Sequence, residues 1–336
     1  MVHMATDVAY VGNEHLWLDA ACLAGLNVLL WLVSLRLGKC WPVDFIWSGW
    51  PPVLCAIVLA REPVTGALHA GDRLQHAWRR WMVCALVAAW GVRLTANFLR
   101  RGGVGHEDWR YANMRRDLGS WFPLASLFCV FLGQSLFLGA ACLPLPAALL
   151  SERPVDASDG CAVALCAGSI LCEAVADRQM DAFQAARRAK RIDAVVVETG
   201  LWAWSRHPNY LGELGWWWGV WLFGAAEAPP WVLAGPVSIT LLFCGVSVEL
   251  LEARQRDNKG DAYARYASRV PARLLLVPPP VGRWLGRTCG AARVMRLELL
   301  AFGALVARLV FVAAGGEMPC VSFVSGYRPW RCGSDG

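Results

Sequence analysis

Seven apolar runs alternate with shorter polar segments along the chain. They cover residues 16–37, 41–60, 81–99, 121–143, 160–176, 209–225 and 231–250. A helix that crosses a lipid bilayer needs about 20 mostly apolar residues, and the runs lie near this length. The pattern therefore predicts an all-α fold, a polytopic membrane helix bundle with about seven transmembrane helices.

Composition strengthens this interpretation. Of the 336 residues, 57% are hydrophobic and 17% are charged, whereas about 25% of the residues of a soluble globular protein are charged. The net charge of +6 arises from Lys and Arg between the apolar runs, where such residues orient a membrane protein. The bilayer is thus the predicted partner, and no nucleic acid is predicted.

The 13 cysteines and six histidines do not predict a metal site. Most cysteines lie inside apolar runs, no two form a Cys-x-x-Cys pair, and the histidines are scattered. Buried free thiols in such a setting behave as small apolar side chains.

The basic residues also predict the orientation of the chain. They follow the first, third, fifth and seventh apolar runs, whereas the segments on the opposite side are mixed or acidic. Because basic loops face the cytosol, the N-terminus is predicted to face away from it. Arg79 and Arg80 contradict the scheme, because they lie on the non-cytosolic side.

The unusual polar residues fall on the same basic side. They are Asp44, Arg93, Asn97, Glu107, Tyr111, Glu173 and Asp177. Taken singly, such residues usually anchor a helix at the membrane interface. Taken together, they predict a shared polar site that opens to the cytosol.

Residues 200–213 read GLWAWSRHPNYLGE and lead into an apolar run. Pro208 suits the first turn of a helix, and the free N–H groups of that turn suit an anion such as phosphate. Arg206 and His207 stand directly before it, while Asn209 and Glu213 are four residues apart and share a helix face. The segment therefore predicts an anion site at the start of a helix.

A simpler interpretation of the same segment is membrane anchoring. Arg206 and His207 would then lie at the lipid headgroups, with Tyr210 and Trp202 in an aromatic belt. Spacing alone does not decide between the anion site and the anchor.

The run SRHPNYLGE followed by WWWG resembles the C-terminal signature of the steroid 5-alpha-reductase superfamily, above all its broad branch of poorly characterised membrane proteins. The resemblance covers roughly residues 44–280 and is strongest over 173–213. It implies a bundle of seven helices around a cavity, with NADPH at the cytosolic end and a sterol-like or other enone lipid deeper inside. It also implies a multi-pass protein of the endoplasmic reticulum in a eukaryote, or of the inner membrane in a bacterium.

The same resemblance implies roles for individual residues. Asp177 and Asn209 match positions that hold the cofactor, Glu213 matches a position close to that pocket, and a C-terminal segment closes over it. The predicted cofactor-binding residues are Asp177, Arg206, His207, Asn209, Tyr210, Arg254, Tyr263, Tyr266, Arg93 and Asn97.

The implied chemistry is hydride transfer to a carbon–carbon double bond conjugated to a carbonyl. A hydrogen-bond donor must polarise the carbonyl as negative charge builds on its oxygen. In the steroid reductases a Tyr and a Glu of the N-terminal half do this, but the N-terminal half of this chain does not align with them. The predicted catalytic residues are Glu213, Tyr111 and Asp44, with Glu107 a further nearby candidate.

Two other functions stay open. The isoprenylcysteine carboxyl methyltransferases carry a related Arg-His-Pro-x-Tyr-x-Gly signature, which would make the chain an S-adenosylmethionine-dependent membrane methyltransferase. Asn209 and Glu213 depart from that pattern and favour the reductases. The third function is a non-catalytic lipid-binding membrane protein, because the N-terminal catalytic match is missing.

The chain divides at about residue 280. Residues 1–280 form the predicted reductase-like membrane domain, with the signature region at 160–280, and residues 281–336 form a C-terminal extension of unknown role. Within the extension, 297–314 is apolar enough for an eighth span, an interfacial helix or a poorly ordered tail.

Overall fold

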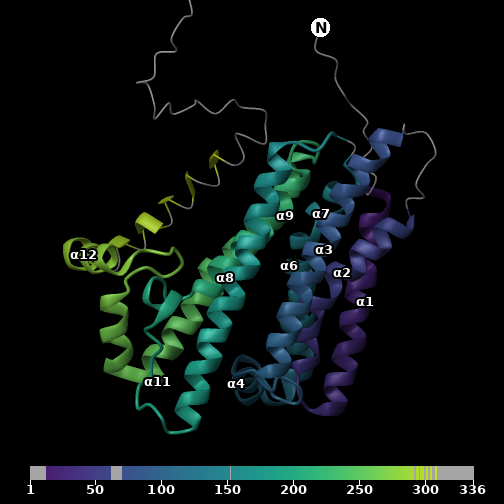
Figure 1. Ribbon diagram of the computed structural model, residues 1–336. Coiled ribbons are helices and arrows are strands. Elements are labelled where there is room, and N and C mark those ends of the chain that lie inside the picture. Colours follow the sequence, from purple (N-terminus) through teal and green to yellow (C-terminus); the bar gives the residue numbers. More distant parts are fainter. Residues whose placement is uncertain are drawn as a thin grey trace, which may run out of the picture.

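The computed structural model describes residues 13–61, 70–151, 153–290, and 293, 294, 296–298, 300, 301, 303, 304, 307 and 308 (Figure 1). Within these residues every regular element is a helix. The helices are α1 (Asn13–Leu37), α2 (Asp44–Arg61), α3 (Ala70–Arg100), α4 (Trp109–Leu118), α5 (Phe122–Ala125), α6 (Gly133–Cys142), α7 (Pro144–Leu150), α8 (Ala157–Arg188), α9 (Pro208–Gly224), α10 (Ala234–Leu242), α11 (Val248–Arg269) and α12 (Pro279–Cys289). The predicted all-α fold is confirmed.

Six stretches of the described chain are long and apolar enough to cross a membrane. They are His15–Leu37, Trp41–Arg61, Ala77–Arg100, Trp109–Leu150, Ala157–Arg188 and Pro230–Arg269, and each contains one predicted run. The remaining run, 209–225, coincides with α9. Its 17 residues are at the lower end of the length that spans a bilayer.

Two of the long stretches contain a π-helical segment. Ser126–Leu132 connects α5 to α6, and Phe243–Ser247 connects α10 to α11. Single π-helical turns inside α-helices often mark functional sites, and both segments contribute residues to the cavity described below.

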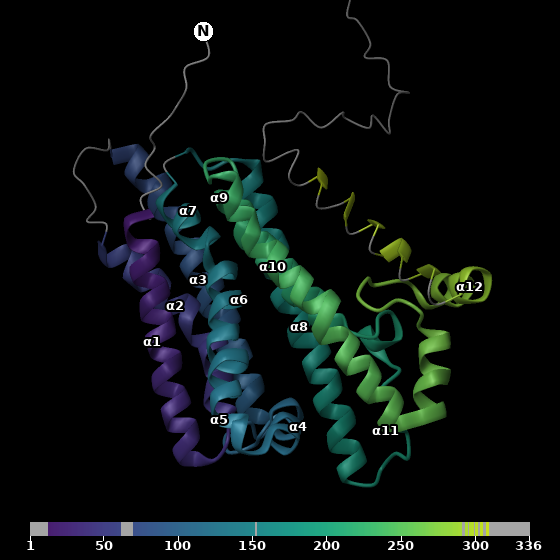
Figure 2. The same cartoon turned by 180° about the vertical axis from the view of Figure 1, so that it is seen from behind.

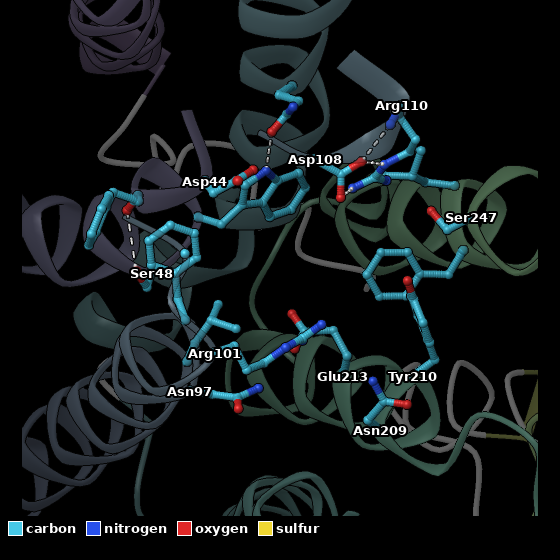
Figure 3. A pocket seen from close by; sticks show the side chains of 18 of the residues that line it. Asp44, Ser48, Asn97, Arg101, Asp108, Arg110, Asn209, Tyr210, Glu213 and Ser247 are labelled. Carbon is cyan, nitrogen blue, oxygen red and sulfur yellow. Dashed lines mark hydrogen bonds and ion pairs between the residues drawn. The ribbon is translucent and has the colours of Figure 1, made fainter. Parts of the chain in front are cut away.

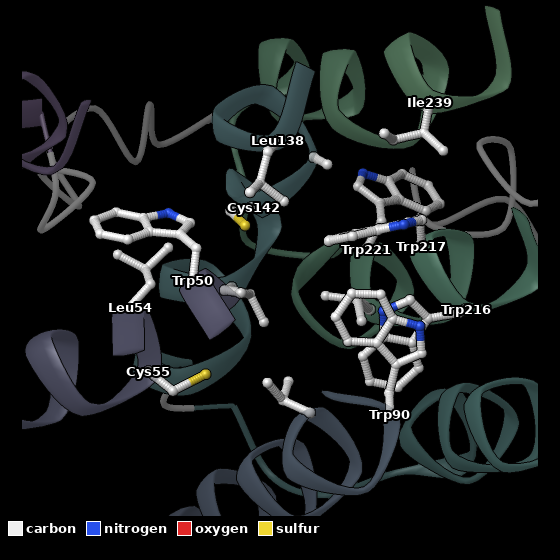
Figure 4. Packing of buried hydrophobic residues seen from close by; sticks show 14 of the residues in the cluster. Trp50, Leu54, Cys55, Trp90, Leu138, Cys142, Trp216, Trp217, Trp221 and Ile239 are labelled. Carbon is white, nitrogen blue, oxygen red and sulfur yellow. The ribbon is translucent and has the colours of Figure 1, made fainter. Parts of the chain in front are cut away.

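The centre of the bundle is the packing of α9 against α8. A Cβ atom at Gly212 would come within 2.4 Å of Glu173 Cγ, and one at Gly219 within 2.5 Å of Cys166 Sγ. Glycine at these positions therefore lets the two helices approach closely. Next to these glycines on α9, Trp216 stacks on Trp90 of α3 with ring centroids 5.3 Å apart (Figure 4).

The predicted basic segments gather at one end of the bundle. In both ribbon views, α4 and the C-terminal ends of α1 and α8 lie at the lower end, opposite the start of α1 (Figures 1 and 2). This arrangement agrees with the alternation of spans on which the predicted orientation rests.

Arg79, which contradicted the orientation scheme, is a structural residue. It is fully buried, and its guanidinium pairs with Asp159 at 2.8 Å. It also donates to the carbonyl oxygens of Ser151, Arg153 and Pro154. Its charge is neutralised inside the protein, so it no longer argues against that orientation.

The described part of the C-terminal extension rests on the domain before it. The predicted boundary at residue 280 falls inside α12. Beyond it, the Glu298 carboxylate accepts hydrogen bonds from the backbone N–H groups of Arg273, Leu274 and Leu275. Much of the predicted apolar stretch 297–314 lies outside the described residues.

Candidate functional site

A cavity of about 580 Å³ lies near the α4 end of the bundle, between α2, α3, α4, α6, α8, α9 and the π-helical segment Phe243–Ser247 (Figure 3). This size is within the usual range for small-molecule and cofactor sites. Residues from distant parts of the chain share its wall. The predicted site residues that line it are Asp44, Arg93, Asn97, Tyr111, Asp177, Asn209, Tyr210 and Glu213.

One wall is built around the Arg93 guanidinium. Arg93 contacts Glu173, lies 3.0 Å from Asp177 and 3.7 Å from Glu213. Asn97, one turn further along α3, donates to Asp177 at 2.8 Å. Residues four apart share a helix face, so Arg93 and Asn97 of α3 lie opposite Glu173 and Asp177 of α8. Three carboxylates surround one cation, which leaves this wall rich in acceptors.

Two indoles hold Glu213 in place. Trp217 Nε1 donates to one carboxylate oxygen at 3.0 Å, and Trp90 Nε1 lies 3.3 Å from the other. Because an indole N–H can only donate, these contacts fix the orientation of the carboxylate. The sequence analysis did not identify Trp90 or Trp217 as site residues, because both lie in apolar runs.

Three buried oxygen atoms on this wall have no hydrogen-bond partner among the described residues. They are Asn97 Oδ1, Glu173 Oε1 and Asn209 Oδ1. A buried acceptor without a partner costs free energy, and all three residues line the cavity. These oxygens suit a ligand group that carries N–H or O–H donors, while Arg93 Nε, which also has no hydrogen-bond partner among the described residues, suits an acceptor.

The opposite wall carries a chain of hydrogen bonds. Trp47 Nε1 donates to Gln134 Oε1, and Gln134 Nε2 lies 2.8 Å from the Tyr111 hydroxyl. That hydroxyl lies 3.4 Å from Asp44 Oδ1. Tyr111 and Asp44, two of the three predicted catalytic residues, are thus brought together, and Gln134 is a site residue that the sequence analysis missed. Glu107 does not line the cavity and pairs with Arg115 instead.

The loop before α4 forms the polar edge of the cavity. Arg101, His106 and Asp108 line it, and Asp108 caps α4 by accepting from the backbone N–H of Arg110 at 2.9 Å. Burial acts to raise the pKa of Asp108, but the hydrogen bonds and charge of Arg110 outweigh it and hold that pKa below its ordinary value. Arg254 stacks over the Trp109 ring at 4.3 Å, so it lies beside this edge without lining the cavity.

Arg206 and His207, which were predicted to face an anionic ligand, bind a carboxylate of the protein itself, and neither lines the cavity. The side chains are only 4% and 7% exposed, and both bind the Glu252 carboxylate, at 2.8 and 2.9 Å. Arg206 also donates to the carbonyl oxygens of Val270 and Pro271. Residues 270–273 cross in front of the start of α9, and their carbonyl oxygens also accept from the backbone N–H groups of Arg206 and His207.

Tyr263 and Tyr266 belong to the same structural cluster. The Tyr263 hydroxyl donates to Glu252 at 2.8 Å, and the Tyr266 hydroxyl donates to the Trp202 carbonyl oxygen at 2.7 Å. Both side chains are buried, and neither lines the cavity. The structure therefore does not bring them to the predicted cofactor site.

Comparisons with known proteins show that the cavity lies in the part of the chain that matches a protein family. Residues 30–270 match the family model described as "Protein of unknown function (DUF1295)". A Schizosaccharomyces pombe protein, "Uncharacterized protein C594.04c", is 33% identical over 272 residues, which cover 73% of this chain and 75% of the yeast protein. No solved structure matches the chain. Every residue that lines the cavity lies inside the family match, whereas α12 lies beyond it.

Proposed function

This chain belongs to the DUF1295 family of proteins of unknown function, and we propose that it is a membrane-embedded, NADPH-dependent reductase. Its substrate is a sterol-like or other lipid in which a carbon–carbon double bond is conjugated to a carbonyl. The observation that carries the proposal is the cavity with two different polar walls. An acceptor wall with Asn97, Asn209 and Glu213 lies across from a wall with the Tyr111 hydroxyl. The resemblance of the α9 start to the steroid 5-alpha-reductase superfamily supports the same assignment.

The residues of the acceptor wall fit NADPH. A nicotinamide ring carries a carboxamide whose NH₂ group needs acceptors, and the oxygens of Asn97 and Asn209 lack partners among the described side chains. Arg101 and His106 at the polar edge suit the phosphate groups, a task that Arg206 and His207 do not fill. When bound, NADPH supplies the hydride.

The protein's own residues bind the lipid and supply the proton. Apolar lining from Phe45, Phe98 and Phe137 holds the lipid and excludes water. The Tyr111 hydroxyl donates a hydrogen bond to the substrate carbonyl oxygen, where negative charge develops as the hydride reaches the far carbon of the double bond. Tyr111, with Asp44 beside it, is placed to deliver one proton to that oxygen, which gives the enol. Tautomerisation then moves this proton from the oxygen to the carbon next to the carbonyl and gives the saturated product, and water reprotonates Tyr111.

One observation favours the methyltransferase alternative. The carboxylates of Glu173, Asp177 and Glu213 surround a single arginine, and an excess of negative charge attracts the positive sulfonium of S-adenosylmethionine. The acceptor wall therefore suits both NADPH and S-adenosylmethionine, and a binding measurement decides between the two.

The test is a side-by-side titration of detergent-purified protein with NADPH and with S-adenosylmethionine, followed by calorimetry. We expect saturable binding of NADPH alone. Binding of S-adenosylmethionine alone would transfer the site to a methyltransferase. A folded protein that binds neither ligand would contradict both enzymes and support the lipid-binding protein.

Replacing Asn209 with alanine tests the acceptor wall directly. Losing one hydrogen bond of about 1–1.5 kcal/mol predicts a roughly tenfold weaker Kd for NADPH. Asn258 is an exposed asparagine on α11 outside the cavity, and Asn258→Ala is the matched control with unchanged Kd. An Asn209→Ala protein that melts normally and binds NADPH like the wild type would remove Asn209 from the cofactor site.

A further inference from the structure

Gln134 is a large polar side chain in α6, whose sequence GQSLFLGAAC is otherwise apolar except for Ser135. It lines the cavity and bridges Trp47 of α2 and Tyr111 of α4. An amide placed between an indole and a phenol in this way has only one orientation that satisfies both contacts, and this orientation determines where the phenol proton points.

The orientation follows from donor and acceptor chemistry. An indole N–H has no acceptor capacity, so the oxygen of the Gln134 amide must face Trp47. The amide nitrogen then faces the Tyr111 hydroxyl at 2.8 Å, and this nitrogen only donates. The Tyr111 oxygen is therefore the acceptor in this contact, and its own proton must point elsewhere.

The remaining partner holds that proton weakly. Asp44 Oδ1 lies 3.4 Å from the Tyr111 oxygen, which exceeds the usual O–H···O distance of about 2.5–3.0 Å. Tyr111 itself is 6% exposed and lines the cavity. A ligand oxygen in the cavity at ordinary hydrogen-bond distance would thus compete well for the proton.

We propose that Gln134, fixed by Trp47, is a positioning residue that directs the Tyr111 proton toward a carbonyl oxygen of the lipid. This inference rests on the proposed function and deepens it. The site should then bind a lipid that carries a ketone more tightly than the same lipid without the ketone oxygen. This preference would depend on the Gln134 amide, although the amide does not contact the double bond.

Gln134→Glu tests the inference, because it keeps the shape and removes the donor. The ionised carboxylate still accepts from Trp47, but its second oxygen accepts the Tyr111 proton and turns it away from the cavity. At about pH 8, where glutamate is ionised, we expect kcat to fall about 100-fold and KM for the enone to rise by up to about tenfold, because the hydrogen bond to the ketone oxygen is lost from the bound state as well. As the pH falls and the carboxyl group is protonated, it donates again and kcat recovers. The Asp44 carboxyl also faces the Tyr111 hydroxyl and titrates in both proteins, so the wild-type pH profile is the reference. A recovery of Gln134→Glu beyond that profile is expected, and a merely structural role for Gln134 does not predict it.

A binding measurement separates this inference from the reductase proposal. The probes are a sterol enone and the matching sterol alkene without the ketone oxygen, each titrated into the full-length protein without NADPH. We expect the wild type to bind the enone about tenfold more tightly. Gln134→Glu should lose this preference at about pH 8 and regain it as the pH falls to about 4, where the introduced carboxyl group becomes protonated. Ser135, which bonds only within its helix to the Phe131 carbonyl oxygen, provides the control Ser135→Ala with unchanged preference.

The outcomes are distinct. Equal enone preference in the wild type and in Gln134→Glu at about pH 8, including no preference in either, overturns the role of Gln134 even where NADPH binds. A preference that vanishes in the variant and returns at low pH supports the inference. Failure of NADPH to bind, with that pattern intact, overturns the reductase and leaves the directed Tyr111 proton as part of a lipid-binding site.

Discussion

Glu252→Ala is expected to lower the free energy of unfolding by about 3–5 kcal/mol, the cost of removing one partner from a buried ion pair. The Glu252 carboxylate is 1% exposed, and one of its oxygens accepts from Arg206, His207 and Tyr263 at 2.8–2.9 Å. Alanine leaves a buried guanidinium without its counter-charge and two further groups without a hydrogen-bond partner. Glu252→Gln keeps an oxygen at this point and should be destabilised less.

Thermal unfolding of the purified protein in detergent measures this effect. For a chain of 336 residues, each kcal/mol corresponds to about 1.5 °C, so the midpoint should fall by about 5 °C. The matched control is Glu198→Gln, which breaks the exposed pair between Glu198 and Arg269. An exposed ion pair contributes at most about 1 kcal/mol, so this variant should melt close to the wild type.

Glu252→Gln also distinguishes the two roles considered for Arg206 and His207, a structural cluster and a cofactor site. A structural cluster predicts that the Glu252→Gln protein, once folded, binds NADPH with unchanged affinity. A normal melting midpoint together with lost NADPH affinity would return Arg206 and His207 to the cofactor site.

The sequence predicted those features that depend on local periodicity. Apolar runs of sufficient length marked the helices, because burial in a bilayer demands about 20 apolar residues whatever the neighbours are. Spacing of four residues also placed Arg93 with Asn97, and Glu173 with Asp177, on single helix faces. The structure joins these faces at one ion-pair cluster.

The features that the sequence did not predict depend on which distant segment covers a given side chain. From the sequence, Arg206 and His207 are expected to be open to solvent at the start of a helix. In the structure, carbonyl oxygens of residues 270–273 accept hydrogen bonds from them. Arg79 looks like a misplaced topology signal until Asp159 neutralises it. Gln134 gave no signal because a lone amide in an apolar run has no periodic partner, and its contacts Trp47 and Tyr111 lie on other helices.

Tyr111→Phe is expected to lower kcat for reduction of an enone lipid by about 10²–10⁴-fold, the usual contribution of a positioned proton donor. Phenylalanine keeps the buried ring and removes only the hydroxyl, so packing of α4 should change little.

Steady-state oxidation of NADPH with an enone sterol measures the loss, and calorimetry on the same sample provides the internal control. The Kd for NADPH should stay at the wild-type value, because the acceptor wall on α3, α8 and α9 is separate from Tyr111 on α4. Loss of turnover with intact cofactor binding is the pattern that a carbonyl-polarising hydroxyl predicts. Full turnover in Tyr111→Phe would instead move the proton donor to another side chain that lines the cavity, such as the Glu173 or Glu213 carboxyl group of the acceptor wall. Equal loss of turnover and of NADPH binding would mean that Tyr111 supports the cofactor pocket as a whole and has no separate part in the chemistry.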